Sequence, residues 1–296
     1  AYGKRVVSGE IADPSYFFLW REAPEGADWR DPAVWKDANP NYGVTVREEF
    51  FRDQLKKPEN IFRRYFLNQW TNLEILWLPA GSWEACQEKQ LELEPKLPLH
   101  VAIDVGLRHD SSAVVCAQKN GDRIILRSRI WENPYPEGHT LYDGWILPIA
   151  ELEGYLRELR VAFPAAACAV EGTVLPGPEY IYDPSFFERS AQLLEGEGLA
   201  MVEFPQTDSR MVPASQRFYQ LIVEKRIAHD GDPGLTRHIK NVIAHQKPRG
   251  WRISKPKGSR LKIDAAVAAA MAASRALEPA PESPRNVYED RGLITL

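Results

Sequence analysis

The sequence predicts an α/β fold, with a mixed β-sheet flanked by helices and a smaller α+β segment before it. Three successive apolar runs between residues 99 and 131, separated by turn signals, have the length and composition of β-strands. Beyond residue 147, strand-like runs alternate with helical patterns. Adjoining strands followed by such an alternation are typical of a sheet with mixed strand directions and helices packed on its faces.

The first portion of the chain is rich in aromatic residues and loop formers. Apolar runs predict strands over residues 4–10 and 15–22. Asp31 and the proline after it mark a helix start, since aspartate can cap a helix and proline suits its first turn. Two more helices are expected, over residues 45–55 with Thr45 as the cap and over residues 60–70.

The second portion carries the α/β pattern. Its predicted strands cover residues 99–105, 113–118, 123–131, 165–170, 179–182, 200–204 and 250–254. Its predicted helices cover residues 147–163, 184–195, 209–225, 234–246 and 263–277. Glycines at 196 and 198 suit the end of the second of these helices.

A polar stretch over residues 88–98 separates the two portions. It contains two prolines and lacks an apolar stripe, so we place a domain boundary there, with residues 1–92 before it and residues 93–278 after it. Residues 279–296 are polar and rich in proline, which predicts a mobile C-terminal tail.

Composition excludes some classes of protein. The net charge is −4, so binding to nucleic acid can be argued only from a local basic patch. The three cysteines are scattered without a zinc-binding pattern, which favours buried thiols in a reducing compartment. No apolar run is long enough to span a membrane and no signal peptide is evident. The phosphate-binding pattern G-x-x-x-x-G-K-[ST] is absent.

Three predicted elements carry an aspartate at the end where a ligand would bind. Asp104 and Asp183 end strand-like runs, and Asp264 lies in the first turn of an alanine-rich helix. Ligands collect at the carboxyl ends of parallel strands, and a helix start tolerates negative charge. Gathered carboxylates repel one another unless cations lie between them, and Mg²⁺ is often held by few carboxylates. The three acids therefore predict a pair of Mg²⁺ ions and metal-assisted cleavage of a phosphodiester.

Each acid taken alone also has a simpler explanation, because an aspartate at a strand end or a helix start commonly caps a turn or a helix. Asp110 is either a fourth ligand or a turn cap. Glu171 is an alternative to Asp183 as the second acid. His229 and Asp230 are either turn residues or water-mediated auxiliaries of the metals.

A basic segment leads directly into the third acid. Residues 247–262 contain no acidic side chain. Tethered to a metal site, such a segment can hold phosphates where the metals act, although a solvated loop is the simpler alternative. Nothing in it indicates recognition of particular bases. The candidate contacts to nucleic acid are Arg249, Arg252, Lys255, Lys257, Arg260 and Lys262.

Taken together, these motifs resemble the large terminase subunit of tailed bacteriophages, the motor-nuclease that packages viral DNA. The family's three acids fall on Asp104 in Ile-Asp-Val-Gly-Leu-Arg-His-Asp, on Asp183 in Tyr-Asp-Pro and on Asp264 in Lys-Ile-Asp-Ala-Ala-Val. The likeness covers nearly the whole chain. It extends to residues 28–32, 38–41, 67–70, 204–207, 211–215, 228–233 and 287–293.

The resemblance implies an RNase H-like nuclease domain over residues 93–278, preceded by the distal part of an ATPase domain and its linker over residues 1–92. It implies two Mg²⁺ or Mn²⁺ ions, with Asp104 bridging both and with Asp183 and Asp264 each completing one shell. The implied activity is endonucleolytic cleavage of double-stranded DNA with little sequence preference. The implied partners are DNA, the portal protein and the small terminase subunit, in the cytoplasm of the infected bacterium.

The chain departs from that family in lacking the Walker motifs. Because it also begins with alanine, we expect a fragment or a truncated product without ATPase activity of its own. Two other functions stay open. The chain could be a non-catalytic docking piece of the packaging motor, with structural acids, or another RNase H-like nuclease of the transposase or resolvase type.

Overall fold

The computed structural model describes residues 2–24, 26–69, 77–106, 110–135, 138–164, 167–170, 173–256 and 258–278, so the predicted tail lies outside the described residues. The chain forms two compact units, Ala1–Trp77 and Leu78–Leu296. In the described part, none of the helices combines the length and the apolar character needed to cross a membrane.

Short helices around aromatic rings make up the described part of the first unit. These helices are α1 (Tyr2–Val7), α2 (Pro32–Ala38), α3 (Glu48–Gln54) and α4 (Glu59–Phe66). Trp35 is fully buried, with ring centroids 5.4 Å from Phe51 and 6.0 Å from Phe62. Asp31 caps α2 as predicted, since its carboxylate accepts a hydrogen bond from the Ala33 N–H at 2.8 Å.

The strands predicted for this unit are wrong. Residues 4–7 belong to helix α1, and no strand forms over residues 15–22. The aromatic rings at alternate positions stack on one another instead, Tyr16 on Phe18 at 6.2 Å and Phe18 on Trp20 at 5.7 Å. An apolar run becomes a strand only where a second strand pairs with it, and none does so in the described residues.

The cap predicted at Thr45 is also wrong. Helix α3 begins at Glu48, and the residue before it, Arg47, makes no side-chain hydrogen bond to the helix start.

A six-stranded mixed sheet forms the centre of the second unit, in the order β7-β6-β1-β2-β3-β8. Strand β2 runs antiparallel to β1 and β3, whereas β6 and β7 run parallel to β1. The predicted mixed sheet is therefore confirmed. Its strands are β1 (His100–Val105), β2 (Ser112–Asn120), β3 (Arg123–Trp131), β6 (Glu179–Tyr182), β7 (Ala200–Glu203) and β8 (Ile227–His229).

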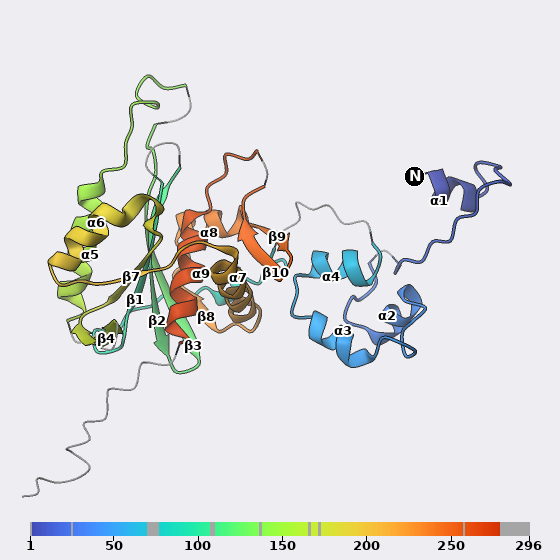
Figure 1. The fold of residues 1–296 in the computed structure, drawn as a ribbon, viewed down its shortest axis with the longest axis horizontal. Coiled ribbons are helices and arrows are strands. Elements are labelled where there is room, and N and C mark those ends of the chain that lie inside the picture. Colours follow the sequence, from blue (N-terminus) through green and yellow to red (C-terminus); the bar gives the residue numbers. More distant parts are fainter. Residues whose placement is uncertain are drawn as a thin grey trace, which may run out of the picture. The chain divides into compact units, whose positions relative to one another are not determined.

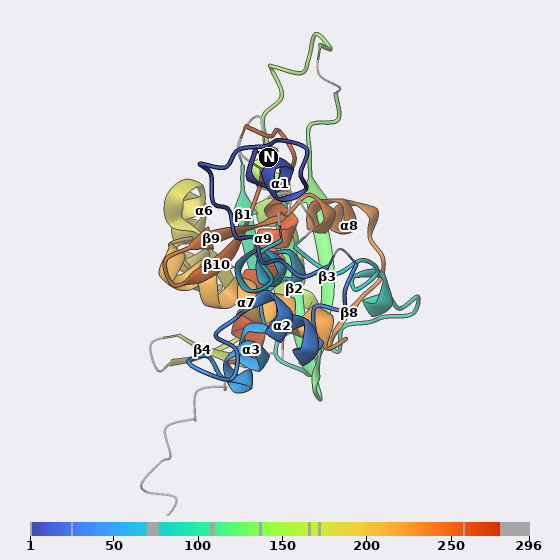
Figure 2. The same ribbon diagram turned by 90° about the vertical axis from the view of Figure 1, so that its right-hand side faces the viewer.

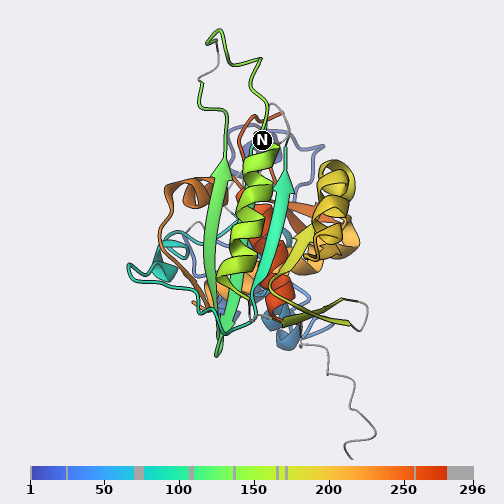
Figure 3. The ribbon, with the colours of Figure 1, turned by 90° about the vertical axis from the view of Figure 1, so that its left-hand side faces the viewer.

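Helices cover both faces of this sheet, with α5 and α6 on one face and α9 on the other (Figures 1 and 3). Alternation along β1 explains the first face, because Val101 and Ile103 pack with Leu152 and Leu156 of α5. The helices are α5 (Ile149–Ala162), α6 (Pro184–Gly196), α7 (Asp208–Val223), α8 (Pro233–Lys240) and α9 (Asp264–Ala276), with a short 3₁₀ helix at Glu84–Cys86.

Small side chains line the second face. Ala102, Ala113 and Ala117 of strands β1 and β2 are fully buried, and α9 packs against both strands. Every residue of α9 from Ala265 to Ser274 is buried. Helices α7 and α8 pack on the remaining sides of α9 (Figure 2). Alanines on both the helix and the sheet let α9 lie close to the sheet. The first residue of α9, Asp264, then lies near the carboxyl end of β1.

This close packing predicts a large difference between two alanine-to-leucine substitutions. Ala272→Leu adds volume to a fully buried position of α9 and is expected to lower the free energy of unfolding by about 1–3 kcal/mol. Ala150→Leu, at an exposed position of α5, is expected to change it by less than about 0.5 kcal/mol. Urea denaturation of both variants measures the difference. Equal stability of the two would contradict the close packing of α9.

Two predictions for the second unit need correction. The helix predicted over residues 234–246 ends at Lys240, and residues 243–247 form β9 (Ile243–Lys247), which pairs antiparallel with β10 (Gly250–Ser254). The run at residues 165–170 yields β4 (Ala167–Val170), which joins β5 (Thr173–Pro176) in a separate two-stranded sheet and not the main one. In the first place the strand at residues 250–254 was predicted, but its partner at residues 243–247 was assigned to a helix. In the second place the partner strand at residues 173–176 was not predicted.

The second unit begins before the predicted boundary. Residues 78–92 pack into it, because Trp83 stacks on His229 at 3.9 Å and Leu91 is buried beside Ile125 and Ala228. The backbone N–H of Glu88 also donates to the carbonyl of His229 at 2.8 Å. The polar stretch at residues 88–98 therefore starts within the second unit.

Candidate metal centre

Asp104 and Asp183 lie side by side at the carboxyl ends of two adjacent parallel strands of the main sheet, β1 and β6. In the parallel pair of β1 and β6, Ile103 is opposite Tyr182, so each aspartate is the next residue along its strand. Asp183 precedes helix α6, yet its side chain makes no capping hydrogen bond. The structure thus brings together two of the predicted acids, and the turn or helix-cap explanation does not account for the side chain of Asp183.

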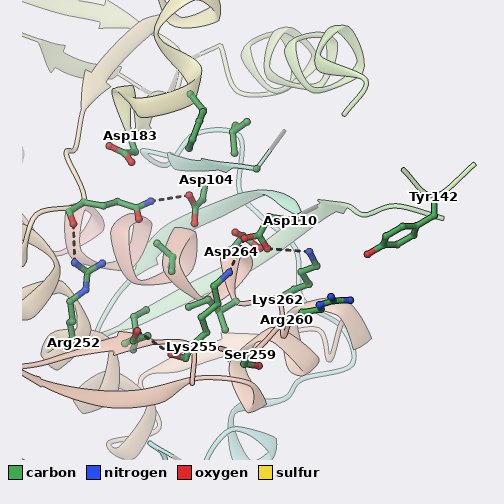
Figure 4. A pocket seen from close by; sticks show the side chains of 18 of the residues that line it. Asp104, Asp110, Tyr142, Asp183, Arg252, Lys255, Ser259, Arg260, Lys262 and Asp264 are labelled. Atoms are coloured by element: carbon green, nitrogen blue, oxygen red, sulfur yellow. Dashed lines mark hydrogen bonds and ion pairs between the residues drawn. The ribbon is translucent and has the colours of Figure 1, made fainter. Parts of the chain in front are cut away.

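Asp264 reaches the same place from the opposite side. It is the first residue of α9, and this helix packs against β1 and β2. Its carboxylate accepts a hydrogen bond from the Ser111 hydroxyl. Figure 4 shows Asp104, Asp183 and Asp264 around one pocket, whose volume is about 1050 Å³.

The raised pKa of Asp104 indicates that the pocket holds more negative charge than the surrounding groups stabilise. Burial raises the pKa of Asp104 well above its usual range, and the nearby charge of Asp264 raises it further. A hydrogen bond from the Gln206 amide, 2.9 Å from Oδ1 of Asp104, acts in the opposite direction. The pKa of Asp264 is also raised, by burial and by the charge of Asp110. Bound cations would stabilise the ionised forms of both carboxylates.

Asp110 differs from the other acids because lysines neutralise it. Lys255 Nζ lies 2.9 Å from its Oδ2 and Lys262 Nζ lies 3.3 Å from its Oδ1. Burial alone would raise the pKa of Asp110, but these two ammonium groups hold it below its usual range. A Cβ on Gly106 would lie 2.5 Å from that of Asp110, so only glycine at position 106 lets Asp110 approach the backbone this closely.

Most of the predicted basic residues lie at this pocket. Lys255, Arg260 and Lys262 line it, as does Arg252. Arg252 is engaged within the protein, since its Nη1 donates to the Gln206 carbonyl at 2.9 Å and to Asp208 at 3.2 Å. Arg252 therefore helps to position Gln206, which donates a hydrogen bond to Asp104.

The other basic candidates are not placed at the pocket. Arg249 lies in the turn between β9 and β10 and is exposed, and Lys257 lies outside the described residues.

His229 and Asp230 do not line the pocket. His229 is buried against Trp83, whose carbonyl lies 2.9 Å from Nε2, and its Nδ1 accepts a hydrogen bond from Gly231. Asp230 pairs with Arg127. These contacts support the turn interpretation over an auxiliary role near metals. Glu171 lies outside the described residues.

Two residues that hold the acids were not predicted from the sequence. Gln206 binds Asp104, and Ser111 binds Asp264 while being fully buried. Neither residue type has a spacing that marks it. The available signals were the proximity of Ser111 to Asp110 in the chain and the position of Gln206 within the motif at residues 204–207.

The donor set suits hard divalent cations, because it consists of carboxylates with an excess of negative charge. Within the described residues, no group of three His, Cys, Asp or Glu side chains is already arranged to hold an ion. Asp104, Asp183 and Asp264 nevertheless share a pocket, and their repulsion would fall if a divalent ion entered it.

Comparisons with known proteins identify the family to which the chain belongs. The sequence profile of the terminase large subunit endonuclease domain matches residues 10–133 and 170–279. Protein YmfN of Escherichia coli (strain K12) is 26% identical over 300 residues, covering 92% of this chain and 65% of YmfN. The large terminase subunit of Enterobacteria phage HK97 is 26% identical over 289 residues, covering 89% of this chain and 55% of that protein.

The crystal structure of the HK97 large terminase has the same fold. Its TM-score to this chain is 0.54 at 20% sequence identity, over 93% of this chain and 60% of that one. The predicted RNase H-like arrangement, a mixed sheet flanked by helices, is thereby confirmed. The chain spans less than two thirds of the length of each of these relatives.

Proposed function

Because the chain belongs to the family of terminase large subunit endonuclease domains, we propose that it is a metal-dependent endonuclease that cuts double-stranded DNA with little sequence preference. One observation carries the proposal: Asp104, Asp183 and Asp264 line a pocket that lysine and arginine side chains also line. This combination suits metal-assisted phosphodiester hydrolysis, because the acids can hold divalent cations while the basic groups hold phosphates.

The three acids would hold two Mg²⁺ or Mn²⁺ ions. When bound, such ions activate water for attack and stabilise the leaving oxygen. The residues around them have supporting roles. The Gln206 amide keeps the Asp104 carboxylate turned into the pocket, and the Ser111 hydroxyl orients Asp264. The positive charges of Arg260 and Lys262 at the pocket wall would bind the DNA backbone.

The likeness to the family also supports proposals for the rest of the chain. Residues 1–92 would be the distal part of an ATPase domain and its linker. Without Walker motifs in this sequence, no ATP hydrolysis by the chain alone is expected. The portal protein and the small terminase subunit would be its partners, in the cytoplasm of the infected bacterium.

Incubation of the purified chain with supercoiled plasmid tests the function. With Mn²⁺ we expect nicked and linear products at many positions, and with excess chelator we expect none. Mn²⁺ should also raise the melting temperature. A docking piece would show neither effect, so their joint absence would sink the proposal. Strand joining, or a preference for branched DNA, would instead favour the transposase or resolvase type.

Removing a positive charge at the pocket should weaken the salt dependence of DNA binding. Arg260→Gln is expected to reduce the slope of log K against log [salt] by about 1, because one phosphate contact fewer releases fewer counterions. Fluorescence anisotropy with a random-sequence duplex in Ca²⁺ measures the slope. Lys119→Gln removes an exposed charge at the opposite end of the sheet and should leave it unchanged. Identical slopes for both variants would remove Arg260 from the DNA interface.

A further inference from the structure

The start of helix α9 lacks a cap from its own chain neighbours. A helix start leaves several backbone N–H groups without partners inside the helix. The Ile263 carbonyl accepts from Ala266 at 2.8 Å and from Val267 at 3.0 Å, but the isoleucine side chain cannot cap the helix. The N–H of Ala265 therefore needs an acceptor from another element, and Ala265 follows Asp264 directly.

His238 of helix α8 is that acceptor. Its ring is fully buried, and Nδ1 lies 3.0 Å from the Ala265 nitrogen. Since the backbone N–H donates, Nδ1 carries no proton and the proton is on Nε2. Nε2 in turn donates to Oε1 of Glu132 at 2.8 Å.

Glu132 is held in the ionised form that this arrangement needs. Its hydrogen bond from His238 lowers its pKa to about 2 despite partial burial, and Arg237 contributes in the same direction. The Arg237 guanidinium donates to the other carboxylate oxygen at 2.6 Å. An ionised Glu132 accepts hydrogen bonds only, so it selects the imidazole tautomer whose Nδ1 is free to accept from Ala265.

A second contact from α8 holds the residue on the other side. Asn241, which follows α8, donates from Nδ2 to the Lys262 carbonyl at 2.9 Å. Helix α8 therefore anchors the backbone both before and after Asp264. Because α8 also packs on β3, these contacts tie the acid to the same sheet that carries Asp104.

We propose that His238 is a positioning residue, which fixes the Asp264 carboxylate in the pocket by capping α9 across the two helices. The inference rests on the proposed function, since it assigns Asp264 to the metals. Partners that orient a ligand without touching the metal typically change metal affinity by about 10–100-fold when they are lost.

Two substitutions separate the two hydrogen bonds of His238. In His238→Asn the amide oxygen can take the place of Nδ1 and accept from Ala265, while the bond to Glu132 is lost. In His238→Gln the longer amide can still donate to Glu132, but no acceptor remains near Ala265. The proposal expects the second variant to lose about tenfold in Mn²⁺ affinity and the first to stay near the unsubstituted chain.

The experiment is Mn²⁺ titration calorimetry of the full chain without DNA, together with the Mn²⁺ concentration for half-maximal plasmid cleavage and the melting temperature in chelator. His100→Gln is the matched control, because His100 binds Glu179 at 2.7 Å, and Glu179 holds Arg275 at the far end of α9. This variant should lower the melting temperature and leave the Mn²⁺ dependence unchanged. Asn241→Ala should weaken Mn²⁺ binding without touching the buried histidine.

Each outcome supports or refutes the positioning role of His238. If His238→Gln binds Mn²⁺ as the unsubstituted chain does, or if His238→Asn and His100→Gln lose as much affinity, positioning by His238 is refuted. If His238→Gln fails to fold, an unchanged affinity in Asn241→Ala overturns the anchoring by α8. The unsubstituted chain alone tests the proposed function, because its failure to bind Mn²⁺ or to cut DNA removes both claims.

Discussion

Replacing Asp104 with alanine is expected to lower the rate of Mn²⁺-dependent plasmid cleavage by about three orders of magnitude or more. Metal ions supply several kcal/mol of transition-state stabilisation, and each 1.4 kcal/mol corresponds to about tenfold in rate. Asp104 has the central place among the acids, because Asp183 follows the neighbouring strand and the charge of Asp264 raises the pKa of Asp104. Initial rates of supercoiled plasmid loss measure the effect.

Asp122→Ala is the control for this experiment. Asp122 is exposed in the turn between β2 and β3, at the end of the sheet opposite to Asp104. Its removal should leave the cleavage rate unchanged, which separates a specific effect of Asp104 from a general effect of charge. Undiminished cutting by Asp104→Ala would falsify the metal centre, whereas an equal loss in both variants would indicate damage to the fold.

Stability should change in the opposite direction from activity when Asp104 becomes asparagine. Without metal, burial and the charge of Asp264 make the ionised Asp104 carboxylate unfavourable in the folded state. Asparagine removes that charge and can still accept the hydrogen bond from Gln206. In chelator at pH 7, Asp104→Asn is therefore expected to melt on the order of a few degrees above the unsubstituted chain.

The pH dependence of this difference has a definite sign. The folded-state pKa of Asp104 is above its unfolded value of about 3.9, so the folded chain holds this proton more tightly. Asp104 therefore lowers stability as the pH rises from about 3.9 through the raised value, and the advantage of asparagine disappears below that window. Mn²⁺ should then stabilise the unsubstituted chain much more than the variant.

Circular dichroism melting curves between pH 4 and pH 8, with chelator and with Mn²⁺, test this expectation. A lower melting temperature of Asp104→Asn at every pH would mean that the carboxylate stabilises the fold by itself. The pocket would then be a structural cluster, as in a non-catalytic docking piece.

The strands and helices whose sequence patterns depend on near neighbours in the chain were predictable. Strand β3 and helices α5, α6 and α9 lie within two residues of the predicted ranges, because alternation and helical spacing depend on near neighbours in the chain. The predicted strands at residues 4–10 and 15–22, and the continuous helix at 234–246, were wrong. There the outcome depended on whether a second strand was present, as it is for β9 and absent in the described residues beside 15–22.

The same division holds for the site. The positions of Asp104, Asp183 and Asp264 marked them as candidates, because an acid at a strand end or a helix start is a local pattern. The residues that control these acids were not marked. Gln206 is 102 residues from Asp104, and Ser111 is 153 residues from Asp264, so no spacing connects them.

By itself, the sequence determined the α/β layout of the second unit, three candidate acids and a basic segment that leads into the third. Only the tertiary structure decided that Lys255 and Lys262 neutralise Asp110, that Arg252 supports Gln206, and that His229 packs in the core. Local preferences arise from neighbouring residues. The charge state of a carboxylate depends on every group that surrounds it in space, and folding alone brings those groups together.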